Sequence, residues 1–453
     1  MTVYYSTNRR VPEVDLADAL LTGQAGDKGL FMPSPLPEMS SDLLGQARDM
    51  SYPDLATAIL KPYVDGVFSD EVLSDICRDA YNFEIPLEKV DDHRHIMRLD
   101  QGPTASFKDF AARFMGRTLG RLVRERNREI LILTATSGDT GSAVANAFLG
   151  VEGIKVVVLF PINEVSDRQR KQMTTLGDNI ATVSIDGKFD DCQALVKQAF
   201  SDPDLADYDL SSANSINIGR LLPQSVYYVY AASRLADIAG GEKVIFSVPS
   251  GNFGDMMGGI LAFHTGLPVA KYIIATNSND EVPNFFATGK YEKVEPSKVC
   301  ISNAMNVGHP SNLARLVDLY GGHMDEQGNL HKQPDMKRMK RDIFPVSIKD
   351  EVTRDTIGAA YREHELILEP HGAVGWAGLL HYLETAPDDK NVTAISLETA
   401  HPAKFPDEIR AITGIEPPLP PSLNGLEDRE ERYRELEASY ESFKAFLQQE
   451  YGK

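Results

Sequence analysis

Cysteine, tryptophan and long apolar runs are all scarce in this chain. Its 453 residues include three cysteines and one tryptophan. The cysteines at 77, 192 and 300 form no CxxC pattern and leave one unpaired in any disulfide scheme, so a reducing cytoplasm is the simplest location and no metal site is expected. No apolar run approaches the roughly 18 residues of a membrane span, and the first ten residues lack the apolar core of a signal peptide. We therefore expect a cytoplasmic protein with no membrane partner.

Positive charge is also in deficit. Lys and Arg number 46 against 66 for Asp and Glu, which gives a formal net charge of −20. A field of that sign repels nucleic-acid phosphates and anionic lipids, so we expect no nucleic-acid partner. A small anionic substrate stays compatible with this charge, because backbone N–H groups and a few cations can dominate inside a cleft.

Alternating short strands and amphipathic helices dominate the chain from Arg94 onward. This pattern is typical of βαβ units around a mostly parallel sheet, and strands that are apolar on both faces are typical of sheets covered by helices on each side. The fold class is therefore predicted to be α/β. The expected strands are residues 95–99, 129–136, 154–161, 181–185, 243–249, 270–277 and 392–397.

Three regions are expected along the chain. Residues 1–92 form a mainly helical N-terminal region, residues 93–240 a first α/β lobe, and residues 241–453 a second α/β lobe. The Gly240-Gly241 pair before a strand marks the border between the lobes. Four prolines between 417 and 421 then stop regular structure, and residues 426–453 are predicted to form a solvated C-terminal helix.

Lys108 stands out as a candidate reactive amine. Ser106 and Asp109 have the spacing of a capping pair, and Phe110 and Phe114 share one helical face. Lys108 then falls in the first helical turn, where the helix dipole and the phenyl groups disfavour an ammonium and favour the free amine that Schiff-base chemistry requires. The alternative is an ordinary surface lysine.

Two turns after predicted strands could bind anions. Residues 250–254 read SGNFG and lead into a helix, where free N–H groups can hold a phosphate ester, although GKS, GKT and GxGxxG are absent. Residues 136–141 read TSGDTG and also follow a strand, which suggests a carboxylate-binding turn at the end of the sheet where ligands bind. A tight βα turn and an N-cap cluster are the respective alternatives.

Three further polar clusters occupy residues 167–171, 214–220 and 399–405. The first has several cations and is also typical of a solvated helix start. The second is rich in amide side chains between apolar residues, and such groups need partners or a ligand when they are buried. The third follows the last predicted strand.

The blocks SFKD, TSGDTG, PSGNFGD and TAHPAKF occur here in that order. This ordered set resembles the threonine synthases, a family of pyridoxal-phosphate enzymes of fold type II, and YYST and DKGLFMP extend the resemblance to the N-terminal region. The resemblance implies two open, mostly parallel-sheet lobes, a pyridoxal 5′-phosphate cofactor, and a monomer or homodimer. The implied reaction converts O-phospho-L-homoserine and water to L-threonine and phosphate by β,γ-elimination and β-hydration.

The resemblance also implies roles for particular residues. Lys108 would be the catalytic residue and would hold the cofactor covalently, while Thr399 would hydrogen-bond the pyridine nitrogen. Asp139 stands where many relatives carry an asparagine that contacts the cofactor's 3-hydroxyl group. The residues around the cofactor phosphate would be Ser250, Gly251, Asn252, Phe253, Gly254 and Asp255. The substrate-binding residues would be Ser137, Gly138, Thr140, Arg168, Lys171, Asn214, Ser215 and Asn217.

Other functions fit part of this pattern. A serine or threonine dehydratase, or a phosphohomoserine lyase that omits the hydration, would share the fold and the lysine. The long N-terminal region argues against a plain dehydratase. A non-catalytic relative that binds pyridoxal phosphate is the alternative from another class, and the intact surroundings of Lys108 disfavour it.

Overall fold

Two parallel sheets form the framework of the computed structural model, which describes residues 2–452. The smaller sheet has five strands, all parallel to their neighbours, in the order β15 (Arg434–Glu437), β7 (Ile180–Asp186), β6 (Ile154–Pro161), β5 (Ile130–Ala135) and β8 (Leu210–Ser211). The larger has the order β13 (Ile343–Ser347), β10 (Val269–Thr276), β9 (Val244–Pro249), β14 (Ala394–Glu398), β4 (Arg94–Arg98) and β3 (Leu87–Lys89). In it, only the pairing of β3 with β4 is antiparallel.

The predicted α/β class is confirmed, and each of the seven expected strands is present with ends shifted by at most two residues. Every residue of β5 and β9 is buried, because helices cover both faces of the sheets. The sequence prediction omitted β13, in which Pro345 interrupts a short apolar run. Since β13 pairs only with β10 at the edge of its sheet, the missing N–H of proline is tolerated there.

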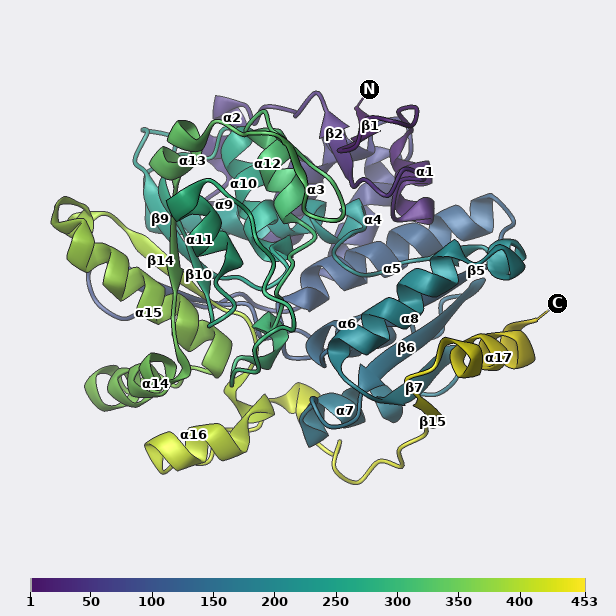
Figure 1. The fold of residues 1–453 in the computed structure, drawn as a ribbon. Helices are drawn as coiled ribbons and strands as arrows, with labels where there is room; N and C mark the ends of the chain where they lie inside the picture. Colours follow the sequence, from purple (N-terminus) through teal and green to yellow (C-terminus); the bar gives the residue numbers. More distant parts are fainter. Residues whose placement is uncertain (1, 453) are drawn as a thin grey trace.

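Helices surround both sheets (Figure 1). Among them, α15 (Pro370–Thr385) packs on β9, β10 and β14, while α8 (Phe189–Ser201) packs on β5 and β6. The helices between β4 and β9 are α5 (Lys108–Glu125), α6 (Asp139–Phe148), α7 (Asp167–Thr174), α8 (Phe189–Ser201) and α9 (Ser225–Leu235). Those that follow β9 are α10 (Gly254–His264), α11 (Glu281–Thr288), α12 (Leu313–Leu319), α13 (Met336–Asp342), α14 (Asp350–His364), α15 (Pro370–Thr385), α16 (Pro406–Thr413) and α17 (Tyr440–Tyr451).

The N-terminal region is mainly helical, as expected. Its helices are α1 (Leu16–Thr22), α2 (Ser41–Gln46), α3 (Tyr52–Val64) and α4 (Asp70–Ala80), and serine hydroxyls cap α2, α3 and α4. It also contains the antiparallel pair β1 (Val3–Ser6) and β2 (Phe31–Ser34). A second small pair, β11 (His323–Met324) and β12 (Leu330–Lys332), lies later in the chain.

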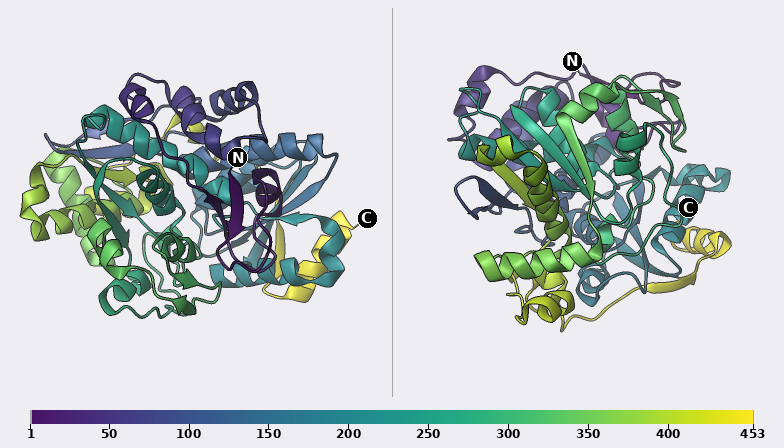
Figure 2. Two further views of the ribbon diagram at one scale, coloured as in Figure 1. Left: turned by 90° about the horizontal axis from the view of Figure 1, so that it is seen from above. Right: turned by 60° about the vertical axis from the view of Figure 1, so that its left-hand side comes forward.

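Sheet membership differs from the expected division of the chain at two places. Strand β4, expected in the first lobe, pairs with β14 in the six-stranded sheet. Strand β15, expected in the second lobe, pairs with β7 in the five-stranded sheet. Both views of Figure 2 show the yellow C-terminal helix beside this sheet. The chain therefore crosses between the sheets more often than a division at residue 240 allows, because strand pairing depends on contacts distant in sequence.

The C-terminal segment also corrects the prediction of one solvated helix over residues 426–453. Residues 434–437 form β15, and α17 covers only Tyr440–Tyr451. Phe443 and Leu447 of α17 are fully buried in one apolar cluster with Cys192 and Leu195 of α8. The helix therefore has an apolar stripe that the many charges of the segment obscure in the sequence. Within residues 2–452, no helix has the length and apolar character needed to cross a membrane.

Replacing Phe443 by alanine tests this packing. Because the ring is fully buried, the variant should lose about 3–5 kcal/mol of unfolding free energy through lost apolar burial and the cavity left behind. Urea unfolding followed by circular dichroism measures the loss. The control is Gln449→Ala on the exposed face of the same helix; equal effects of the two changes would contradict the packing.

Candidate active site

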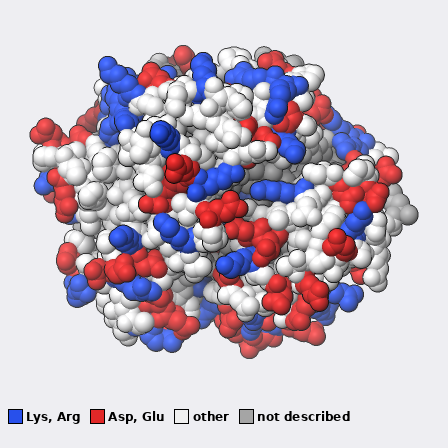
Figure 3. Space-filling model, viewed as in Figure 1, with Lys and Arg blue, Asp and Glu red and all other residues white. Residues whose placement is uncertain are grey.

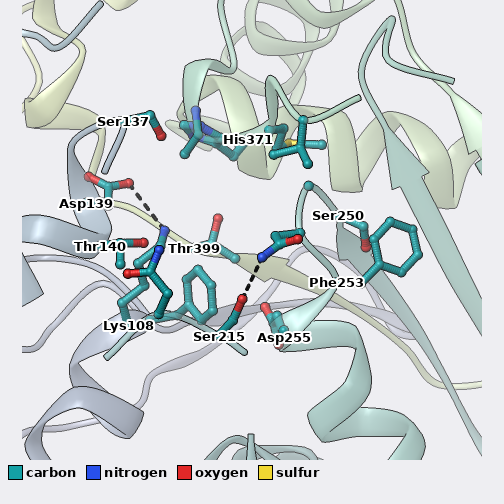
Figure 4. Close-up of a pocket in the computed structure, with 18 of the residues that line it drawn as sticks. Lys108, Ser137, Asp139, Thr140, Ser215, Ser250, Phe253, Asp255, His371 and Thr399 are labelled. Atoms are coloured by element: carbon teal, nitrogen blue, oxygen red, sulfur yellow. Dashed lines mark hydrogen bonds and ion pairs between the residues drawn. The ribbon is translucent and has the colours of Figure 1, made fainter. Parts of the chain in front are cut away.

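One pocket lies where strands of both sheets end (Figure 4). Residues that follow β5, β9 and β14 line it, as the ligand position at the carboxyl ends of parallel strands predicts. The other lining residues labelled in Figure 4 are Lys108 at the start of α5, Ser215 after β8 and His371 in the first turn of α15. Of the predicted residues, the lining includes Lys108, Ser137, Asp139, Thr140, Asn214, Ser215, Ser250, Gly251, Asn252, Phe253, Gly254, Asp255 and Thr399.

Lys108 is the first residue of α5, as expected, but the helix begins in a different way. Its N-cap is Phe107, which makes no side-chain cap. Asp109 instead accepts hydrogen bonds from the Thr104 N–H at 2.8 Å and the Thr104 hydroxyl at 2.7 Å, so the predicted pairing of Ser106 with Asp109 is wrong. Burial lowers the pKa of Lys108, and the Asp139 carboxylate at 3.8 Å opposes that effect. The net lowering favours the uncharged amine.

Asp139 belongs to a buried ion pair that the sequence did not reveal. Its Oδ1 lies 2.5 Å from Nζ of Lys404, and the two side chains are 2% and 0% exposed. Gln169 Nε2 also donates to Oδ1 at 2.9 Å. Burial alone raises the pKa of Asp139, but the Lys404 and Lys108 charges outweigh it and hold that pKa well below its usual range. The carboxylate thus stays ionised beside the Lys108 amine.

The turn between β9 and α10 has the form expected of a phosphate site. Helix α10 begins at Gly254 and runs for 11 residues, and Gly254, Asp255 and Met256 of its first turn line the pocket. The N–H groups of a first turn have no partner within the helix and can bind an anion. Within this turn, the residue with a left-handed backbone is Phe253, at φ 63°, and neither Gly251 nor Gly254 has a positive φ. A Cβ on Gly251 would lie 2.9 Å from Cα of Met305, so the glycine allows a close approach of the 304–305 loop.

Asp255 anchors the start of α10. Its Oδ1 accepts hydrogen bonds from the hydroxyls of Tyr227 and Tyr228 at 2.5 and 2.7 Å. Burial raises the pKa of Asp255 to about 6, although both tyrosine hydroxyls oppose the rise. These contacts join α10 to α9 and give Asp255 a structural task in addition to its place on the pocket wall.

The TSGDTG turn fits both interpretations considered for it. Thr136 Oγ1 accepts the N–H groups of Gly138 and Gly141 at 2.9 and 2.8 Å, as in an N-cap cluster. Ser137, Asp139 and Thr140 line the pocket, as a binding turn requires. Gly138 does not line the pocket. Its φ is 128°, and a Cβ added to it would lie 2.6 Å from the Gln169 side chain.

Thr399 lies next to a cluster of ionisable side chains formed by Glu369, His371 and Glu398. Its Oγ1 lies 3.5 Å from Oε1 of Glu369, and Nδ1 of His371 lies 2.5 Å from the other oxygen, Oε2. The Ala304 N–H donates to Nε2 of His371 at 3.0 Å, which leaves the ring proton on Nδ1 facing Glu369. Burial and the neighbouring Glu369 raise the pKa of Glu398 well above its usual value. The sequence analysis did not predict Glu369 and His371 as site residues, because their only local signal is a Glu-Pro-His start to a helix.

Four predicted substrate ligands do not line the pocket: Gly138, Arg168, Lys171 and Asn217. Arg168 and Lys171 both bind Glu427, each at 3.1 Å. Asn217 is buried, and its Nδ2 donates to the carbonyls of Leu20 and Ser212 at 2.9 and 3.0 Å. The cations were expected at the site because of their charge, but an acidic side chain from 259 residues further along the chain pairs with Arg168.

Arg220 lines the pocket as a cation, whereas Arg168 and Lys171 do not. It lines the pocket together with Lys108, and it is 3% exposed. Nη1 donates to the Ala213 carbonyl at 2.6 Å, whereas Nε has no hydrogen-bond partner among the described residues. Burial lowers the pKa of Arg220 to about 10, so the guanidinium stays charged at neutral pH. A buried cation with an unused donor favours an anionic ligand.

Comparison with known proteins agrees with this fold and pocket. A family model described as "Pyridoxal-phosphate dependent enzyme" matches residues 87–397, so the chain belongs to that class of enzymes. Models of the threonine synthase N terminus and C-terminal part match residues 3–81 and 372–447.

The most similar relatives specify the family further. Threonine synthase of Serratia marcescens is 38% identical over 98% of both chains, and that of Escherichia coli is 38% identical over 92% of this chain and 93% of its own. The structure of PLP-bound threonine synthase from Brucella melitensis matches with a TM-score of 0.91 at 33% identity over 99% of both chains. The chain belongs to the threonine synthase family.

The ion pair at Asp139 leads to a prediction about Lys108. In Asp139→Asn the attraction that raises the pKa of Lys108 is lost, and the Lys404 charge is no longer balanced. Both changes lower the pKa of Lys108 further. NMR titration of the apoprotein with labelled lysine ε-carbons measures this pKa, with Lys108→Arg to assign the signal. The exposed carboxylate variant Asp167→Asn is the control, and an unchanged or raised pKa in Asp139→Asn would contradict the argument.

Proposed function

We propose that this protein converts O-phospho-L-homoserine and water to L-threonine and phosphate. The observation that carries the proposal is the meeting of Lys108, the glycine turn before α10 and Thr399 in one pocket. Two relatives that align with 98% of the chain are named threonine synthase, which supports threonine as the product. Three free, buried cysteines fit a reducing compartment, for which we propose the cytoplasm. A monomer or homodimer stays our prediction.

The pocket residues fit pyridoxal phosphate by their chemistry. The turn at Ser250, Gly251, Asn252, Phe253 and Gly254 offers N–H groups for its phosphate, and Thr399 offers a hydroxyl for its ring nitrogen. Lys108, whose side chain is 13% exposed, offers an amine for its carbonyl carbon, with Asp139 beside that amine. When bound, the cofactor withdraws electrons from the substrate and so makes its Cα and Cβ protons acidic.

Lys108 is the group that moves protons in this proposal. Because burial favours its uncharged form, Nζ can take a proton from Cα and then from Cβ, and it can return protons on the same face. Phosphate leaves Cγ, a proton is added at Cγ, and water adds its hydroxyl to Cβ and a proton to Cα. Asp139 keeps its negative charge throughout, since Lys404 holds it ionised.

We assign the substrate to other polar groups of the pocket lining. We assign the phosphate to Arg220, Asn214 and Ser215, whereas Arg168 and Lys171 are occupied by Glu427. The hydroxyls of Ser137 and Thr140 are the proposed donors to the carboxylate. Figure 3 shows basic and acidic side chains intermingled on one face of the molecule, so the negative net charge is not a uniformly acidic surface.

The assay that tests this function measures three products together. Purified protein reconstituted with pyridoxal phosphate and given O-phospho-L-homoserine should release threonine and phosphate in equal amounts, with little 2-oxobutanoate. Phosphate with 2-oxobutanoate and no threonine would support a lyase without hydration instead. Lys108→Ala should lose at least about a thousandfold in kcat, because covalent binding and proton transfer both need the amine. Activity within tenfold of the parent would contradict the role of Lys108.

The choice of phosphate ligand gives a separate prediction. Arg220→Gln should raise KM for O-phospho-L-homoserine by about 10- to 100-fold, because a charge-assisted hydrogen bond to phosphate is lost. Arg168→Gln is the matched control and should leave KM within about twofold, since its guanidinium binds Glu427 and the Ala403 carbonyl. Steady-state kinetics of both variants show whether Arg220 or Arg168 binds the phosphate. A larger rise in KM for Arg168→Gln than for Arg220→Gln would instead support Arg168, which the sequence analysis expected among the substrate-binding residues.

A further inference from the structure

A buried arginine lies behind the pocket wall, on α12. Arg315 is fully buried, and its guanidinium donates to the carbonyls of Phe31, Ser215 and Ile216 at 3.2, 3.0 and 2.7 Å. Nη1 also donates to the side-chain oxygen of Asn312 at 2.6 Å. Arg315 therefore joins the N-terminal region to the loop that carries Ser215.

This arginine fixes the orientation of the Asn312 amide. A guanidinium can only donate, so the Asn312 atom that faces Nη1 has to be the oxygen. The Asn312 Nδ2 group is then directed at Ser215 Oγ, 3.1 Å away, and at the Asn252 carbonyl, 2.9 Å away. Since Asn312 is fully buried, no water competes for these positions.

The Asn252 amide is fixed by a second group that only donates. The Ser311 backbone N–H lies 2.7 Å from the Asn252 side-chain oxygen. Asn252 Nδ2 consequently faces Ser215 Oγ at 2.7 Å; Figure 4 marks this hydrogen bond at Ser215. Both amide donors therefore converge on one hydroxyl oxygen.

Two donors fill the acceptor capacity of the Ser215 hydroxyl and leave its single proton to be donated elsewhere. Ser215 lines the pocket, and a Cβ on Gly254 of the phosphate turn would lie 3.1 Å from its own Cβ. We infer that Arg315 and Asn312 are positioning residues that commit the Ser215 hydroxyl to donate to a phosphate ester in the pocket. The inference rests on the proposed function and extends it from the residues of the pocket wall to the residues that orient them.

The decisive variant is Asn312→Asp, which keeps the shape of the side chain. A carboxylate only accepts, so it stays paired with Arg315 and takes the Ser215 proton away from the pocket. If the ester is that of the substrate, KM for O-phospho-L-homoserine and the inhibition constant of inorganic phosphate should both rise about tenfold, with kcat within about threefold. The inhibition constant of threonine, which has no phosphate, should stay unchanged.

The same variant identifies the source of the phosphate. If Ser215 donates to the cofactor phosphate, the dissociation constant of pyridoxal phosphate, measured by absorbance titration of the apoprotein, should rise about tenfold while KM stays near the parent value. Either pattern supports the inference. If the parent enzyme makes no threonine, the proposed function fails, whereas an active parent with neither constant shifted in Asn312→Asp overturns the positioning role alone.

Asn312→Ala separates positioning from packing. It leaves a small cavity but nothing that captures the proton, so it should weaken ligand binding less than Asn312→Asp does. A packing role predicts the opposite order, because aspartate preserves the shape and alanine does not. Thermal unfolding of both apo variants shows whether the fold is intact.

Ser215→Ala completes the test. If Asn312 acts through Ser215, either change at 312 should have little further effect on ligand constants in the Ser215→Ala background. Additive effects would overturn the inference, since they would show that residue 312 acts by another route, such as its charge. If Asn312→Asp does not fold, the cycle of Asn312→Ala with Ser215→Ala gives the same decision without a buried charge.

Discussion

The chemistry of the pocket depends on a balance between the burial of Lys108 and the charges beside it, which lowers the pKa of its amine next to an ionised carboxylate. Attraction to Asp139 by itself would hold the ammonium charged. The Lys404 charge opposes that effect, since its Nζ lies 2.5 Å from Asp139 and that of Lys108 lies 3.8 Å away. Burial then decides the balance and lowers the pKa of Lys108. A buried ion pair is weak evidence of stability, and here its clearer consequence is the protonation state of its neighbour.

Backbone pairing fixes the distance between the two ends of the proposed cofactor site. The Phe107 N–H donates to the Thr399 carbonyl at 2.9 Å, and the His401 N–H donates to the Ala105 carbonyl at 3.0 Å. The start of α5 and the segment after β14 therefore form one short antiparallel bridge. Lys108 and Thr399, almost 300 residues apart in the sequence, are held by main-chain hydrogen bonds that substitution of side chains leaves intact. The crossing of β4 into the six-stranded sheet makes this pairing possible.

Local patterns in the sequence were enough to predict the buried parallel strands and the glycine turn before α10. Strands such as β5 are apolar along their whole length, and a glycine turn between a strand and a helix is a local signal. Contacts distant in sequence explain the errors. Arg168 is paired by Glu427, β15 finds its partner in β7, and Lys404 is paired by Asp139. Charge in a motif shows that a partner is needed, but only the fold shows whether that partner is a ligand or another side chain.

Groups that can only donate hydrogen bonds determine how the amide and hydroxyl groups around the pocket are oriented. Each such group forces an oxygen toward itself and therefore turns the nitrogen of the same amide away, so orientation passes from Arg315 through Asn312 to Ser215. Arg220 presents a charged donor to the same pocket. A chain with a net charge of −20 can thus offer an anion a wall of donors, because a few buried, oriented groups act at hydrogen-bond distance where the distributed surface charge is screened by solvent.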